Sequence, residues 1–454
     1  MSRTQEIIKK QREFFGTNIT KDLRFRKEQL LKLRKTIQEY EGKIIEALAA
    51  DLNKSAFEAY MTEVGIVLEE ISYAFKHYKS WAKPKKVKTP LTQFPAKSMI
   101  YSEPYGVVLI ISPWNYPFQL AIAPLVGALT AGNCAVLKPS NHSPKTSEVI
   151  AEMLGKAFPE EYIAVVLGGR EANKDLLAQK FDYIFFTGGP AVGRFVMEAA
   201  AKHLTPVTLE LGGKSPCIVD ATAKIDLAAK RIVWGKFINA GQTCVAPDYV
   251  LVQKGVKEKL LASMAKYISK FFSKTYEQKF PKIVNEKHFQ RLLGLMESGD
   301  IYCGGKSDPK INRIEPTILD NVSWESPIMQ EEIFGPLLPV LEFEDLEDVV
   351  KQVNARPKPL ALYLFTTSKA NEKHILTSIS HGGGCINDTV VHLATPYLPF
   401  GGVGESGMGS YHGKASFDTF SHKKSIMKKS NLIDIPLRYP PYPESTKLLK
   451  KFMK

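Results

Sequence analysis

The sequence predicts an α/β fold: a doubly wound parallel-sheet domain, a second α/β domain and a small β arm. Three observations predict it. Continuous apolar runs such as Val107–Ile111 are typical of strands covered on both faces. Helical segments alternate with such runs from residue 106 to 211, as in repeated βα units. Residues 84–104 form a Lys-, Thr- and Pro-rich segment with β-compatible pairs, which indicates exposed strands.

Composition narrows the class of protein. A chain of 454 residues with 44% hydrophobic and 24% charged residues fits a globular protein of two or three domains. The net charge of +14 is diffuse and accompanies no nucleic-acid motif, so we expect solvated basic faces and no nucleic-acid partner. The five cysteines are odd in number and lack C-x-x-C spacing, which argues against disulfides and a metal site.

The N-terminal residues and the most apolar run of the chain bear on the location of the protein. The N-terminal residues are charged and lack the apolar stretch of a secretory signal, so we expect a reducing, cytoplasmic location. The most apolar run, 120–137, is interrupted by Pro124, Thr130 and Asn133. It predicts a buried helix followed by a strand, and no membrane span.

The elements follow in order along the chain. Residues 20–50 carry one apolar stripe and predict a long amphipathic helix, and a second helix is expected over 56–81. Exposed strands in 84–104 could pair with another chain. The first sheet is expected to contain Val107–Ile111, Cys134–Lys138, Ile163–Leu167, Tyr183–Phe186 and Pro206–Leu211, with helices between them.

A second α/β region is expected after Gly212. Its predicted strands are Pro216–Val219, Tyr249–Val252, Leu337–Leu341 and Leu360–Phe365. The tail after about Thr389 is rich in Gly, Pro and aromatic residues, so we expect it to be irregular.

Cys244 lies among small residues in Asn239-Ala-Gly-Gln-Thr-Cys244-Val-Ala-Pro247, directly after a helical run. A cysteine is the most ready nucleophile at neutral pH, because a small fraction is already thiolate. A single cysteine is nevertheless more often an inert core thiol. The segment around Cys244 therefore does not by itself indicate a catalytic site.

Two further motifs support a catalytic role for Cys244. Glu210 ends the last strand of the first sheet, where an apolar crevice would raise its pKa and suit it to be a general base. A buried ion pair with Lys214 is the alternative. Asn115, in Pro113-Trp-Asn-Tyr-Pro117, follows the first strand and offers a neutral amide donor. A plain turn asparagine is its alternative.

A glycine-bearing turn points to a dinucleotide. Gly188 and Gly193 bracket a strand-to-helix turn, where backbone can approach a pyrophosphate. The G-x-G-x-x-G spacing is absent, so a simple tight turn is equally compatible. Lys138 ends the second strand and could hold ribose or phosphate, or be a surface lysine. Glu332, in Gln330-Glu-Glu-Ile-Phe-Gly-Pro336, would by itself be an ordinary carboxylate.

Taken together, the segments 239–247, 210–215 and 113–117 resemble the aldehyde dehydrogenase superfamily, and the resemblance covers essentially the whole chain. The segments 386–392 and 410–414 resemble the class 3 branch. The resemblance implies NAD- or NADP-dependent oxidation of aldehydes to carboxylic acids through a thiohemiacetal and a thioester. It also implies medium- to long-chain aliphatic or aromatic substrates.

The resemblance implies roles for individual residues. Cys244 would be the nucleophile, Asn115 and the Cys244 backbone N–H the oxyanion hole, and Glu210 or Glu332 the base. No metal is implied. The implied cofactor-binding residues are Trp114, Lys138, Gly188, Gly189, Gly193, Leu211, Glu332 and Phe334.

Two positions depart from the family pattern. Pro190 replaces a common hydroxyl residue and removes one possible phosphate hydrogen bond. Asn141 stands where many members carry a glutamate that repels the 2′-phosphate of NADP+. We therefore expect NADP+ to be accepted alongside NAD+.

The resemblance also implies an organisation: a cofactor-binding domain over 1–207, interrupted by an arm over 84–104, a catalytic domain over 208–390, and a tail over 391–454 that returns to the arm and the cofactor-binding domain. The arm implies a homodimer. Two other classes stay open, an acylating enzyme that transfers to coenzyme A and a catalytically inactive homologue. Retention of Glu210 argues against the first, and intact Cys244 and Asn115 against the second.

Overall fold

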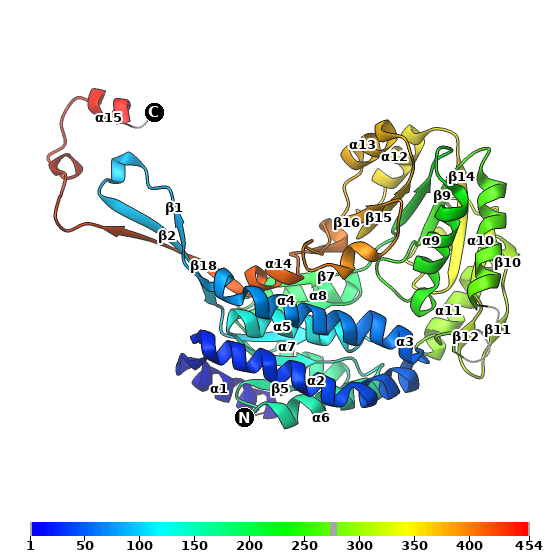
Figure 1. Cartoon of the computed structure of the whole chain (residues 1–454), viewed down its shortest axis with the longest axis horizontal. Helices are drawn as coiled ribbons and strands as arrows, with labels where there is room; N and C mark the ends of the chain where they lie inside the picture. Colours follow the sequence, from blue (N-terminus) through cyan, green and yellow to red (C-terminus); the bar gives the residue numbers. More distant parts are fainter. Residues whose placement is uncertain (1, 273–278, 453–454) are drawn as a thin grey trace.

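The computed structural model describes residues 2–272 and 279–452 (Figure 1). A six-stranded sheet has the order β17-β7-β6-β3-β4-β5. Five of its strands are parallel, and only β17 runs antiparallel, against β7. Its strands are β3 (Val107–Ile111), β4 (Cys134–Lys138), β5 (Ile163–Val165), β6 (Tyr183–Thr187), β7 (Val207–Glu210) and β17 (Gly407–Met408).

Helices connect these strands and cover the sheet. The connecting helices are α5 (Gln119–Ala131), α6 (Pro144–Ala157), α7 (Arg170–Leu177) and α8 (Pro190–Ala201). Every residue of β3, β4 and α5 is buried, which explains their continuous apolar composition. The predicted buried helix and strand over 120–137 are therefore confirmed, and no helix of the described residues has the length and apolar character to cross a membrane.

The N-terminal helices pack on this layer. They are α1 (Arg3–Gly16), α2 (Leu23–Leu52), α3 (Ala56–Ala59) and α4 (Gly65–Ala82), with a π-helical turn (Tyr60–Val64) between α3 and α4. The long predicted helix corresponds to α2, whose Leu30, Leu33 and Ile37 are fully buried. Helix α2 packs against α6, and α4 against α5. Helix α1 had no predicted counterpart.

A second sheet has seven strands in the order β10-β13-β14-β9-β8-β15-β16, all parallel except β10. Its strands are β8 (Pro216–Val219), β9 (Tyr249–Gln253), β10 (Asp300–Cys303), β13 (Thr317–Asp320), β14 (Leu337–Phe343), β15 (Ala361–Phe365) and β16 (Gly383–Ile386). Around it lie α9 (Ile225–Phe237), α10 (Lys257–Phe272), α11 (Glu286–Met296), α12 (Leu346–Asn354) and α13 (Lys369–Ser378). Two parallel sheets of this kind confirm the predicted fold class, whereas the residue boundaries of the domains stay a prediction.

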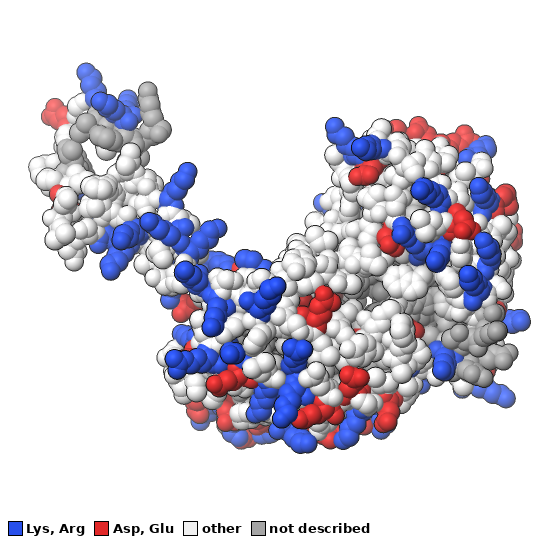
Figure 2. Space-filling model, viewed as in Figure 1, with Lys and Arg blue, Asp and Glu red and all other residues white. Residues whose placement is uncertain are grey.

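The arm is a three-stranded antiparallel sheet that projects from the body (Figure 1). It contains β1 (Lys85–Val87), β2 (Ala96–Pro104) and β18 (Ser421–Lys429). The tail is therefore less irregular than predicted, since it also contains α14 (Gly413–Thr419) and α15 (Lys447–Phe452). Strand β18 escaped prediction because it is lysine-rich and exposed, and its pairing with β2 over nine residues comes from backbone hydrogen bonds. Lysines gather along this arm in Figure 2.

Candidate active site

Cys244 lies in the loop between α9 and β9, at the junction of the two sheets' layers. The loop is anchored by unusual backbone: Asn239 and Ala240 both have φ 52°, and Gly241 has φ +72°. Left-handed non-glycine residues are uncommon and persist where the surroundings hold them. At Gly241 a Cβ atom would lie 2.2 Å from the Gly335 carbonyl oxygen, so this loop tolerates no side chain there.

Asn115 follows β3 and lies against the Cys244 loop. Its Nδ2 donates a hydrogen bond to the Gln242 carbonyl (3.0 Å), two residues before Cys244. Its own carbonyl accepts one from Asn239 Nδ2 (2.8 Å). An amide NH2 group carries two hydrogens, so the bond to Gln242 leaves one for a second acceptor. The residue is 2% exposed, which puts this donor in a water-poor site.

Glu210 ends β7 and is 3% exposed. Neither carboxylate oxygen has a hydrogen-bond partner among the described residues, and burial raises the pKa of Glu210 well above its usual range. The alternative ion pair with Lys214 is wrong. Lys214 Nζ instead pairs with Asp248 (2.6 Å) and donates to the carbonyls of Ile328 and Glu331.

Glu332 is a second buried carboxyl group with a perturbed pKa. Burial, followed by the nearby Asp248 carboxylate, raises the pKa of Glu332 to about 8. A Cβ atom on Gly212 would lie 2.0 Å from Glu332 Oε2, so a glycine is required at position 212 for this close approach. Glu332 therefore lies directly against the segment that follows Glu210.

The thiol is influenced by both carboxyl groups. Burial, then the negative charges of Glu332 and Glu210, raise the pKa of Cys244 to about 12. At neutral pH the sulfur therefore carries its proton. Nucleophilic attack requires that this proton leave, and the ionised form of a neighbouring carboxyl group is the natural acceptor.

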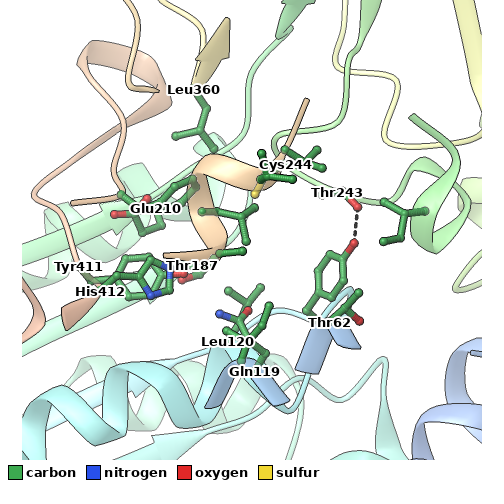
Figure 3. Close-up of a pocket in the computed structure, with 18 of the residues that line it drawn as sticks. Thr62, Gln119, Leu120, Thr187, Glu210, Thr243, Cys244, Leu360, Tyr411 and His412 are labelled. Carbon is green, nitrogen blue, oxygen red and sulfur yellow. Dashed lines mark hydrogen bonds between the residues drawn. The ribbon is translucent and has the colours of Figure 1, made fainter. Parts of the chain in front are cut away.

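Two cavities meet at Cys244. The first is almost wholly apolar, and Figure 3 shows Cys244, Glu210 and Leu120 in its wall. The second, named the polar cavity for the charged residues Lys287, Arg291 and Glu331 in its wall, lies beside Asn115 and Glu332. The residues shared by both walls are Leu120, Thr187, Glu210, Leu211 and Cys244. A group bound in one cavity can thus reach the same sulfur as a group bound in the other.

The polar cavity gathers most of the predicted site residues. Its wall contains Trp114, Asn115, Gly188, Gly189, Glu210, Leu211, Cys244, Glu332 and Phe334. Gly193 is not part of that wall, because it packs inside α8 against Leu211, where a Cβ atom would lie 2.6 Å from Leu211 Cδ2. Lys138 is also elsewhere: it is 3% exposed at the end of β4, and burial lowers its pKa.

Other residues of these cavities escaped the sequence analysis. Lys287, His288 and Arg291 on α11 line the polar cavity, and no motif spacing marked them. Thr187 lines both cavities, and its hydroxyl has no hydrogen-bond partner among the described residues. Thr187 opens the Thr-Gly-Gly turn, so its position at a strand end was a usable signal. Tyr411 and His412 reach the apolar cavity from the tail (Figure 3).

Known proteins show the same architecture. The model of the aldehyde dehydrogenase family matches residues 2–426. The 4,4'-diaponeurosporen-aldehyde dehydrogenase of Staphylococcus aureus is 51% identical over 445 residues, 97% of each chain. The dimeric NADP-preferring aldehyde dehydrogenase of Canis lupus familiaris is 45% identical, over 97% of this chain and 98% of that one.

A solved structure, the substrate-bound state of Staphylococcus aureus AldH, superimposes with a TM-score of 0.98 at 50% identity and covers 100% of both chains. These matches extend over nearly the whole sequence and include both sheets, the arm and the Cys244 loop. The chain therefore belongs to the aldehyde dehydrogenase family, whose members are oxidoreductases that oxidise aldehydes with NAD or NADP.

Proposed function

We propose that this protein oxidises aldehydes to carboxylic acids through a covalent thioester on Cys244. The observation that carries the proposal is the position of Cys244 and Glu210 in the wall shared by an apolar and a polar cavity. An aldehyde in the apolar cavity and a cofactor in the polar one would both reach the sulfur. A buried carboxyl group at the same junction suits the handling of protons.

The residues divide the reaction between them. Cys244 Sγ attacks the aldehyde carbon, and its proton passes to Glu210 or Glu332 and from there to solvent, so that the carboxyl group is ionised again before water attacks. The Asn115 amide and the Cys244 N–H stabilise the alkoxide of the thiohemiacetal, a contribution of about 10² to 10³ in rate for one such donor. After oxidation to the thioester, Glu210 accepts a proton from the attacking water and returns it to the departing Cys244 sulfur, so that the carboxylic acid leaves and the thiol is regenerated.

The polar cavity fits a nicotinamide dinucleotide. Gly188 and Gly189 line this cavity just before α8, and a Cβ atom on Gly189 would meet nothing within 4 Å, so there is room for a ligand beside the start of the helix. Such N-termini attract phosphate. Lys287 adds positive charge, and Arg291 lies in the same wall, paired with Glu331 (3.4 Å). Glu332 Oε1 has no hydrogen-bond partner among the described residues and could accept from a ribose hydroxyl. The cofactor supplies the two-electron oxidant.

We propose medium- to long-chain aliphatic or aromatic aldehydes as substrates. The lining of the apolar cavity supports this, because burial of hydrocarbon there gains about 25 cal/mol per Å². The name of the Staphylococcus aureus relative refers to a polyene aldehyde. The apolar side chains in its wall include Met61, Ile66, Leu120, Leu211, Trp234, Ile238, Leu360, Val390, Val391, Leu393, Ala394 and Phe400.

Rapid mixing with a panel of aldehyde chain lengths tests the proposal. We expect wild-type NAD(P)H formation with kcat/KM rising with chain length, and complete loss in Cys244→Ala with cofactor binding retained. Glu210→Gln should give a burst of about one NAD(P)H per Cys244 followed by slow turnover, because water attack on the thioester is impaired. Full turnover in Cys244→Ala would refute the thioester, and a burst confined to Glu332→Gln would move the base to Glu332.

A further inference from the structure

A buried ion pair lies behind the loop that carries Asn115. Lys54 and Glu63 contact each other with both side chains fully shielded from solvent. Lys54 follows α2, and Glu63 belongs to the π-helical turn between α3 and α4. Such turns are rare and are frequently found at functional sites. Neither residue has a role in the chemistry described above.

The pair holds the Asn115 loop at both ends. Lys54 Nζ donates to the Asn115 carbonyl (3.1 Å) and lies 4.0 Å from the centre of the Tyr116 ring. Glu63 Oε2 accepts from the backbone N–H groups of Phe118 (2.8 Å) and Gln119 (3.2 Å), where α5 begins. A carboxylate there satisfies unpaired N–H groups and faces the positive end of the helix dipole.

The same N-terminal segment also holds the Cys244 loop. Glu58 Oε1, from α3, accepts from the backbone N–H of Asn239 (2.7 Å), the first left-handed residue of that loop. Asn239 Nδ2 then donates to the carbonyls of both Asn115 (2.8 Å) and Gln242 (3.1 Å). The Asn115 carbonyl thus receives two donors, Lys54 and Asn239, which fix the backbone from which the Asn115 amide projects.

A role in stability alone explains this arrangement poorly. Removing two charges from water costs free energy that their attraction often fails to recover, and apolar residues of similar size commonly stabilise a core as well or better. What a charged pair adds is direction, because each hydrogen bond ties a particular atom of the loop. We propose that Lys54 and Glu63 are positioning residues that hold Asn115 where its amide stabilises the oxyanion formed on Cys244. This inference rests on the function proposed for Asn115.

A double-mutant cycle tests the inference with the full chain. We expect Asn115→Ala to lower kcat/KM about 10²- to 10³-fold. Lys54→Met should lower kcat about 10- to 100-fold, because a shift of about 1 Å in a catalytic group can cost that much, while KM and the cofactor dissociation constant stay within about threefold. In the Asn115→Ala background, Lys54→Met should change kcat less than about twofold, since Lys54 acts through Asn115.

The two hypotheses fail in different ways. If Asn115→Ala retains wild-type kcat/KM, the oxyanion role of Asn115 is wrong. If Asn115→Ala is impaired but Lys54→Met lowers kcat by the same factor in both backgrounds, the positioning role is wrong while the proposed function stands.

A double variant without either charge shows whether Lys54→Met loses activity only because the fold is destabilised. Lys54→Met leaves Glu63 buried without its partner, which destabilises the fold. Lys54→Met/Glu63→Gln removes both charges, and the amide oxygen introduced by the second substitution can still accept from the α5 N–H groups. We expect this double variant to regain melting temperature but not kcat. Recovery of kcat together with the melting temperature would show that the pair is only structural.

Lys43→Met is the matched control for this set. Lys43 lies on the same helix, α2, and its ion pair with Glu152 (2.8 Å) is more than half exposed. An exposed pair contributes little, so kcat and melting temperature should both stay at the wild-type values.

Discussion

At the scale of the residue, the reacting centre is a set of buried titratable groups whose protonation states are coupled. Cys244, Glu210 and Glu332 all have raised pKa values, and burial is the first cause in each case. The carboxyl groups in turn oppose ionisation of the thiol. Ionisation of any one of them therefore changes the others, and the pH dependence of activity belongs to the set rather than to a single residue.

Replacing Glu332 with Gln tests this coupling. Above about pH 8 the Glu332 carboxylate is ionised and its charge disfavours the thiolate, so removing it should lower the pKa of Cys244. We expect the rate of iodoacetamide alkylation to rise at a pH about one unit lower than in wild type, equivalent to about 1.4 kcal/mol. Glu331→Gln, at the adjacent and half-exposed position, is the control and should keep the wild-type profile. An unshifted Glu332→Gln profile would separate Glu332 from the thiol.

At the scale of the element, the turn between β4 and α6 bears on cofactor choice. Ser143, not Asn141, occupies the N-cap of α6, so Asn141 is free of the capping role that its sequence position allows. Asn141 is exposed and lines a cavity with His142, Arg170 and Lys174. Arg170 begins α7, and both cations face the same hollow. These charges support the expectation that a 2′-phosphate is tolerated here.

Asn141→Glu should shift the cofactor ratio towards NAD+. Two unit charges about 4 Å apart repel by roughly 1 to 4 kcal/mol, so we expect the ratio of kcat/KM for NADP+ to that for NAD+ to fall at least about tenfold. Asn141→Gln adds the same length without the charge and should leave the ratio unchanged. Equal ratios in Asn141→Glu and wild type, or no use of NADP+ by wild type, would contradict the electrostatic argument.

At the scale of the whole molecule, the arm exposes an edge strand of its sheet. Strand β18 is exposed along almost its whole length and forms an edge, with Ile426 and Met427 at 43% and 47% exposure. Exposed edges and apolar side chains on a projecting sheet are typical of surfaces that pair with another chain. We therefore keep the expectation from the sequence that the arm joins two copies of this chain into a homodimer.

Charges placed on both faces of the arm should dissociate that dimer. We expect light scattering to give twice 50.7 kDa for wild type and 50.7 kDa for Ile426→Glu/Met427→Glu at micromolar concentration, because two carboxylates would be desolvated at the interface. Leu376→Glu, at an exposed apolar site on α13, is the control and should stay dimeric. A monomeric wild type would refute the homodimer, and a dimeric double variant would place the interface elsewhere.

The sequence alone determined the fold class and most of both sheets, because apolar runs and helical stripes are local consequences of burial on two faces or one. It also marked Cys244, Glu210 and Asn115, each beside a strand end or a helix end. It missed β18, which is exposed and lysine-rich, and α1, whose buried residues are Thr4, Ile7, Ile8 and Gln11. It also missed the short strands β10, β13, β16 and β17.

Only the tertiary structure decided what surrounds those residues. Three features depend on segments far apart in the chain. They are the burial of Glu210 without a hydrogen-bond partner among the described residues, the approach of Glu332 to Gly212, and the Lys54–Glu63 pair behind Asn115. A pKa and a hydrogen bond depend on distance and exposure in space, and neither quantity is written in the spacing of residues along the sequence.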